Sequence, residues 1–143
     1  DPVYYVEAKM QIKQIEKNLQ KHPKQKLKVE ENIKWPAEII EKVNNDHELR
    51  ESVMEEYPEL FQVISALMFK HDPIGINFDT NTDEYDPEAG TVIPRLKHAN
   101  SADDVTTIVH EEFVRWFGKN SARNRNNYIN LGQEIWNLWI KYL

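Results

Sequence analysis

The chain has 143 residues, of which 40% are hydrophobic and 29% are charged, and its formal net charge is −6. This composition is typical of one globular domain and argues against wholesale disorder. The chain has no cysteine, which excludes disulfides, zinc–thiolate sites and thiol catalysis. Its apolar runs are only a few residues long, far short of the roughly 20 that span a bilayer, so we expect no membrane partner.

Charge divides the chain into three parts. Residues 1–34 carry a net charge of +3, residues 35–118 carry −12 from eighteen acidic and six basic side chains, and residues 119–143 carry +3. The acidic middle disfavours nucleic acid, because phosphates are bound by Lys and Arg, and it favours a basic protein partner. The alternative is that the acids only solvate outer helix faces and the two ends fold back to neutralise them.

The first predicted helix lies near the N-terminus. Apolar residues repeat at steps of three and four between Tyr5 and Leu19, and Pro23 ends the pattern. Residues 24–34 are lysine-rich, and we interpret them as a connector. We therefore treat residues 1–34 as a basic N-terminal helix followed by a connector.

Three helices are predicted next. Pro36 suits the first turn of a short helix, residues 44–46 break it, and Asp46 is a plausible N-cap for the next segment. Pro58 opens the most regular helix of the chain, whose apolar residues follow the spacing of a core-facing stripe. Residues 71–75 stop that helix, because they contain a proline and a glycine.

The second half of the acidic region predicts two more helices. Asp86 and Pro87 are interpreted as cap and first turn of a helix that Gly90 and Pro94 weaken or kink. Ser101 begins a capping-box-like pattern before the next helix.

Gly118 is predicted to end that helix. A polar joint over residues 119–127 then leads to a last, Trp-rich helix, whose apolar stripe is wide enough to be covered on two sides. Together, these segments predict an all-α, single-domain bundle of about six helices over residues 1–143.

One acidic loop partly matches a calcium-binding loop. Asp79, Asn81 and Asp83 occupy the first three ligand positions of an EF-hand. Glu84 then stands where the loop needs glycine, and Gly90 stands where the bidentate glutamate belongs. An ordinary Asn/Asp turn is the alternative interpretation. We expect no metal and no other cofactor, with this loop as the one incomplete candidate.

The sequence shows no catalytic motif. The nucleophile elbow, the P-loop and the Rossmann glycine pattern are all absent. His110 begins a His-Glu-Glu run without the second histidine of a zinc motif. We therefore predict no catalytic residues and no enzyme activity. The open alternative is a small carboxylate-dependent enzyme with paired acids near His71 or His110.

Residues 69–118 carry a recognisable pattern. It consists of Asp72–Gly75, then Asp83–Tyr85 and Glu88, the apolar steps over Val92–Leu96, and a helix that ends at Phe113–Gly118. This pattern resembles the YugE-like proteins, which are small bacterial helical proteins of uncharacterised function. The match covers about 50 of the 143 residues. The resemblance implies an all-α fold and a bacterial, cytoplasmic setting, and it supplies no catalytic residues.

A protein-binding function fits these observations best. Compact, acidic, cysteine-free helical proteins are similar in style to immunity proteins that neutralise secreted bacterial toxins. We expect an immunity- or antitoxin-like inhibitor that occludes a basic toxin domain. Tyr85 is predicted as the exposed aromatic anchor, with Asp83, Glu84, Asp86 and Glu88 steering the partner. The alternative to binding or catalysis is a structural or regulatory scaffold that dimerises through its terminal helices.

Overall fold

The computed structural model describes residues 37–76 and 80–142, and within them it contains helices and no strand. The prediction of an all-α fold is confirmed. The predicted N-terminal helix and connector lie outside the described residues. The helices in the described part are α2 (Ala37–Glu56), α3 (Pro58–His71), α4 (Asp86–Val92), the 3₁₀ helix η2 (Ile93–His98), α5 (Ala102–Ala122), the 3₁₀ helix η3 (Arg125–Tyr128) and α6 (Ile129–Tyr142).

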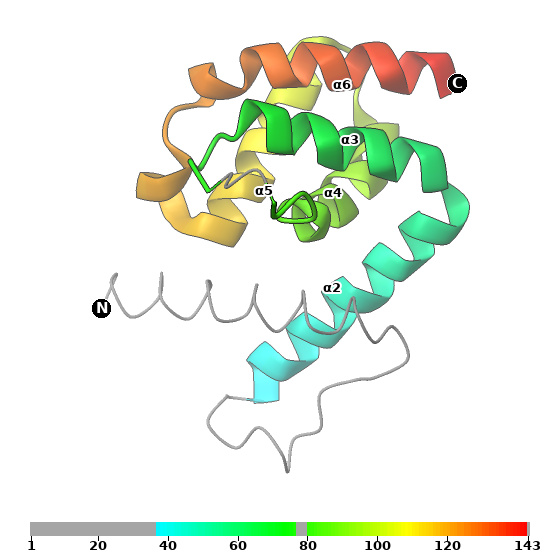
Figure 1. The fold of residues 1–143 in the computed structure, drawn as a ribbon, viewed down its shortest axis with the longest axis vertical. Coiled ribbons are helices and arrows are strands. Elements are labelled where there is room, and N and C mark those ends of the chain that lie inside the picture. The colour runs from blue at the N-terminus through cyan, green and yellow to red at the C-terminus, as the bar shows by residue number, and fades with distance from the viewer. Residues whose placement is uncertain (1–36, 77–79, 143) are drawn as a thin grey trace.

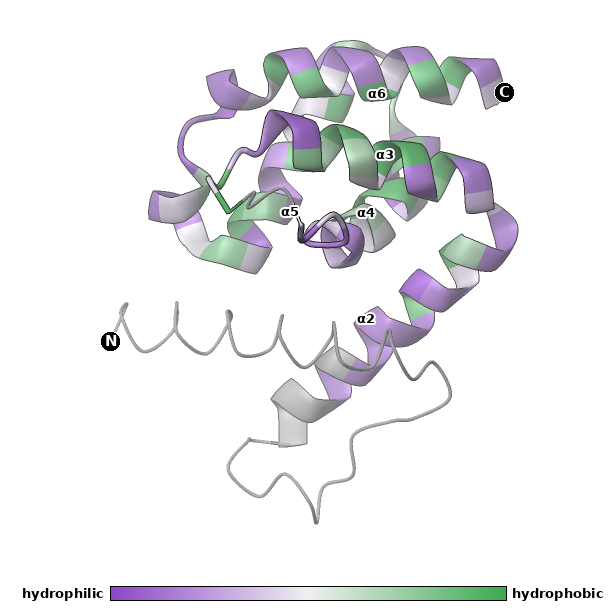
Figure 2. Cartoon of the chain, in the orientation of Figure 1, coloured by the Kyte–Doolittle hydropathy of each residue, from purple (hydrophilic) through white to green (hydrophobic). Residues whose placement is uncertain are grey.

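Helices α3 to α6 form the main body, and α2 extends away from it (Figure 1). α6 packs on α5 and α3, while α4 packs against α2, α3 and α5. Hydrophobic residues concentrate on α3 to α6, whereas α2 is predominantly hydrophilic (Figure 2). The apolar core therefore lies among α3, α4, α5 and α6, where burial of these side chains provides the main driving force for folding. Its largest fully buried hydrophobic members are Tyr85, Tyr128, Phe113, Leu60, Ile64, Met68, Ile93, Leu96, Leu131 and Ile135.

A glycine permits the close approach of α6 to α5. A Cβ atom added at Gly132 would meet the hydroxyl oxygen of Thr106 and would lie 2.9 Å from the Cα atom of that residue. The obstruction includes backbone, which cannot rotate away. Any larger side chain at this position would force the two helices apart.

Several predicted helix ends are confirmed. Pro58 lies in the first turn of α3, and the side chain of Ser101 accepts a hydrogen bond of 3.1 Å from the backbone N–H of Asp104 at the start of α5. Gly118 has φ 84° and interrupts the helical backbone of α5, although helical residues continue to Ala122. Asp72 ends α3 in the left-handed region, with φ 47°.

Two local predictions are wrong. α2 runs without interruption through residues 44–46, so Asp46 is not an N-cap. The helix continues there, and Asp46 uses its carboxylate for a tertiary ion pair with Arg115 of α5. Asp86 is the first residue of α4 rather than its N-cap, which is Tyr85, and its carboxylate accepts a hydrogen bond from Ser65 of α3.

Candidate functional site

The predicted epitope over residues 83–88 is divided between the surface and the core. Tyr85 and Glu88 are both 0% exposed. The prediction that Tyr85 is an exposed anchor is therefore wrong, and so is a steering role for Glu88. The physical reason is that the first turn of α4 packs into the body, where the ring of Tyr85 stacks on Phe113 with centroids 5.7 Å apart.

Tyr85 instead connects α4 to the end of α3. Its hydroxyl donates a 2.6 Å hydrogen bond to the Oδ1 atom of Asp72, which also accepts a 2.8 Å bond from the backbone N–H of Ile76. Burial, reinforced by the Asp72 carboxylate, raises the pKa of Tyr85 far above its ordinary value. The hydroxyl therefore remains a donor, and these bonds hold Asp72 in its left-handed conformation.

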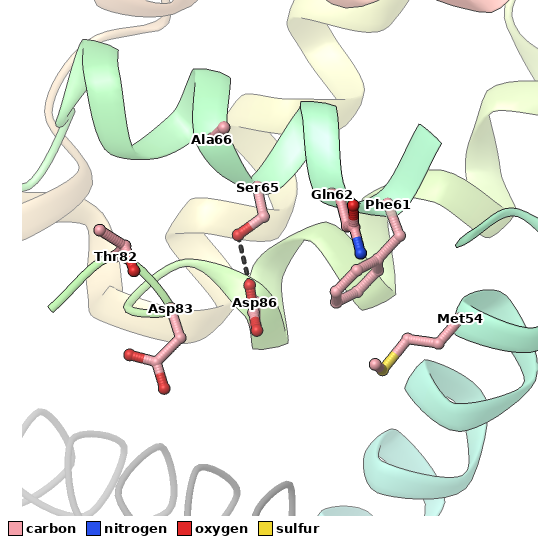
Figure 3. A pocket seen from close by; sticks show the side chains of 8 residues that line it. All are labelled: Met54, Phe61, Gln62, Ser65, Ala66, Thr82, Asp83 and Asp86. Carbon is pink, nitrogen blue, oxygen red and sulfur yellow. Dashed lines mark hydrogen bonds between the residues drawn. The ribbon is translucent and has the colours of Figure 1, made fainter. Parts of the chain in front are cut away.

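Asp83 and Asp86 lie on the rim of a surface pocket of about 350 Å³. The pocket is formed by the end of α2, one flank of α3, the loop before α4 and the first residue of α4, as Figure 3 shows. Its lining residues are Met54, Phe61, Gln62, Ser65, Ala66, Thr82, Asp83 and Asp86. Of the five predicted epitope residues, only these two contribute to the pocket. Glu84 is partly exposed beside them in the chain.

The two carboxylates have different surroundings in the pocket. The hydroxyl of Ser65 donates to the Oδ1 atom of Asp86 and holds that carboxylate toward α3. The carboxylate of Asp83 points away from α3 (Figure 3). Met54, which is 38% exposed, and the ring of Phe61 supply apolar surface next to these acids. The pocket thus combines an apolar wall with two acidic groups.

The incomplete calcium loop cannot be assembled from the described residues. Asp79 lies outside them. The side-chain nitrogen of Asn81 donates a 2.7 Å hydrogen bond to the carbonyl oxygen of Ile76, which is a loop-closing role. Residues 37–76 and 80–142 contain no group of three or more His, Cys, Asp or Glu residues that could hold a metal ion.

The residues considered for catalysis are engaged in structural contacts. The Nε2 atom of His71 lies 2.7 Å from Oε2 of Glu134, and Nε2 of His110 lies 2.9 Å from the carbonyl oxygen of Arg123. Glu111 and Glu112 share the guanidinium of Arg95 as their cation, at 2.7 Å and 3.0 Å.

Sequence reasoning missed a buried polar interface where α2 meets the body. His47 and Arg50 are 2% and 1% exposed, and an Arg50 nitrogen lies 2.9 Å from Nδ1 of His47. Beside them, Arg115 of α5 pairs with Asp46 at 3.3 Å and with Glu112 at 3.1 Å. The sequence did contain a signal for this buried face of α2. Residues 47, 50 and 53 are spaced three apart and lie toward one side if the helix is continuous.

Within the described part of the chain, every helix is too short or too polar to cross a bilayer. No family model, no curated protein and no solved structure matches the chain.

Proposed function

We propose that this chain is a non-enzymatic protein-binding domain whose partner is a basic protein. The observation that carries the proposal is the pocket where Asp83 and Asp86 lie beside Met54 and Phe61. In its most concrete form, the domain acts in the bacterial cytoplasm as an immunity- or antitoxin-like inhibitor. Its mechanism is occlusion of a basic toxin surface, with no bond made or broken.

The pocket has the chemistry that receives a lysine or arginine side chain. Such a side chain lays an apolar stem along hydrophobic surface and keeps its charged head in a polar environment. Met54 and Phe61 offer the surface for the stem, and the carboxylates of Asp83 and Asp86 accept hydrogen bonds from the head. Hydrogen bonds between charged partners are about twice as strong as those between neutral ones.

The surroundings of the pocket reinforce this preference. Glu51 lies about one helical turn before Met54 on α2, and Glu84 lies between the two acids of the rim. The whole stretch from residue 35 to residue 118 carries −12. A field of one sign raises the rate of encounter with a partner of the opposite sign, and salt weakens that effect.

A capture experiment tests the proposal. The full chain is immobilised and exposed to a lysate of its native host at low salt, and the captured basic protein is then titrated against Asp83→Lys. We expect this variant to bind at least tenfold more weakly than wild type, because an attractive contact becomes a repulsive one. Higher salt should weaken wild-type binding and should affect the variant less.

Glu41→Lys is the matched control. Glu41 is exposed on α2 and lies thirteen residues before Met54, a distance of roughly 20 Å along a helix. The control makes the same change in net charge away from the pocket and should retain most of the wild-type affinity. Failure to capture a basic protein at low salt, or equal weakening by both variants, would overturn the proposal.

A further inference from the structure

A second apolar hollow lies between α3 and α6, on a flank of α3 other than the one that forms the acidic pocket. It is a shallow groove of about 240 Å³ lined by Val63, Leu67, Glu134, Asn137, Leu138 and Lys141. Val63 is 43% exposed, although it is an aliphatic side chain in a well-formed helix. Nearby on α6, Ile140 is 45% exposed and Tyr142 is 46% exposed.

The charges at the two ends of the groove are opposite. Glu134 and Lys141 both line it, and they are seven residues apart on α6. Seven residues are close to two helical turns, so both side chains lie along one edge of the helix. Asn137 and Leu138 occupy the midpoint between them.

This arrangement is complementary to itself. When two copies of α6 cross in opposite directions about a two-fold axis at residues 137–138, Glu134 of each copy faces Lys141 of the other. Leu138 then meets its own counterpart at the axis, and Val63 and Leu67 provide the apolar surface on either side. A two-fold contact requires one patch that matches itself in this way.

The distribution of charge over the molecule favours this face for self-association. The formal charges of α6 cancel, because Glu134 and Lys141 are its only charged residues, whereas residues 35–118 carry −12. The charges of α3, Glu59 and Lys70, also cancel. Two copies that meet along α3 and α6 therefore bring no net negative charge into the contact, which limits their mutual repulsion. A contact through the acidic pocket would bring like charges together.

We infer that a second copy of this chain docks on the α3–α6 groove and forms a symmetric dimer in which Glu134 and Lys141 pair reciprocally. This contact does not use the acidic pocket, which lies on the other flank of α3. Self-association can therefore be tested independently of the proposed basic partner.

The decisive experiment is a reciprocal charge reversal on the full chain, followed by sedimentation velocity at several protein concentrations. We expect wild type to show a monomer–dimer equilibrium. Glu134→Lys and Lys141→Glu should each raise the dimer dissociation constant about tenfold, because two attractive pairs become two repulsive pairs. An equimolar mixture of the two variants should recover the dimer, because all pairs between unlike chains are again attractive.

Lys119→Glu is the matched control, because Lys119 is an exposed lysine on α5 outside the groove. It should leave the dimer dissociation constant within about twofold of wild type. Circular dichroism of each variant checks that the helices are retained, and the mixture serves as a second check because unfolded variants would not reassociate. Monomeric wild type at every concentration, or a mixture no more associated than its components, would overturn the inference.

Discussion

Helices α3 to α6 meet around Phe113 through aromatic and aliphatic side chains, whereas α2 docks on the same body largely through polar ones. Phe113 is 0% exposed, and its ring packs on Tyr85, Phe117 and Tyr128. At the α2 interface, Arg115 instead pairs with Asp46 and Glu112. The region around Phe113 excludes water with hydrocarbon, whereas the partly buried Arg115–Asp46 ion pair joins α2 to α5.

The two regions are expected to have different roles: the apolar core stabilises the fold, and the polar interface orients α2. Burial of apolar surface is favourable whatever its exact partners, so the core around Phe113 supplies most of the free energy of folding. A buried ion pair gains little net free energy, because desolvation offsets attraction, but losing one partner is costly. The α2 interface therefore contributes little net free energy when it is complete, and we expect its ion pair to orient α2 on the body.

The largest expected effect is in the apolar core. Phe113→Ala should lower the free energy of unfolding by about 4 kcal/mol, since it removes a fully buried ring and leaves a cavity. Urea denaturation followed by circular dichroism measures the change. Ile129→Ala, at a residue 48% exposed on α6, is the control and should stay within about 0.5 kcal/mol of wild type. Equal losses in the two variants would contradict the assignment of the core.

The same substitution at two glycines compares the regions directly. Gly132→Ala should cost about 3 kcal/mol, because the new Cβ meets the backbone of Thr106 at 2.9 Å. Gly90→Ala should cost about 2 kcal/mol, because the new Cβ meets the Cβ and Cγ atoms of Arg50 at 2.8 Å and its Cα at 3.2 Å, and a Cβ atom cannot rotate away. Thermal unfolding of both variants gives the order, and a reversed order would show that the α2 interface is the less adaptable of the two.

At the polar interface, Arg115→Met should cost roughly 2 kcal/mol, because it leaves Asp46 without this cation in a partly buried site. Adding Asp46→Leu should restore most of the loss, since no uncompensated acid then remains there and Glu112 keeps Arg95. Chemical denaturation of wild type, both single variants and the double variant forms a double-mutant cycle. A double variant less stable than Arg115→Met would show that the ion pair stabilises the fold outright.

The smallest expected effects are two opposite responses to pH. Burial raises the pKa of Asp46, even though Arg115 acts to lower it. The folded state therefore holds this proton more tightly than the unfolded chain, so the free energy of unfolding of wild type should rise relative to Asp46→Asn as pH falls toward 4. The hydrogen bond from His71 lowers the pKa of Glu134, so the contribution of Glu134 should be lost as pH falls through its folded pKa.

Unfolding measured from pH 7 to pH 3 in wild type, Asp46→Asn and Glu134→Gln separates these two contributions. NMR titration of the two carboxyl groups reports the pKa shifts directly. Responses of the same sign for Asp46 and Glu134 would contradict the assignment of burial as the cause at Asp46.

Local rules anticipated much of the main body. Pro58 at the start of α3 and Ser101 at the start of α5 follow from helix-end preferences, and the apolar spacing of α3 marks its buried face. The predicted break at residues 44–46 is wrong. Asn and Asp weaken a helix through local side-chain hydrogen bonds to the backbone, but a tertiary contact can outweigh this small preference. Asp46 makes such a contact with Arg115, which lies 69 positions later in the chain.

The candidate site was anticipated only in part. Asp83 and Asp86 do lie at a surface pocket, as members of the predicted acidic epitope. Tyr85 and Glu88 are buried, because α4 turns them toward the core. Sequence alone did not distinguish these four residues, since all of them lie in or next to an acidic helix start and exposure depends on how that helix is rotated against its neighbours.

The sequence by itself determined the helical class, the positions of several helix ends and the concentration of negative charge between residues 35 and 118. Those properties depend on spacing and composition, which act locally along the chain. Only the tertiary structure decided which acids reach water, which ones pair across helices, and where α3 remains partly uncovered beside α6. Those properties depend on the packing of side chains far apart in the sequence, where one rotation of a helix exchanges buried positions for exposed ones.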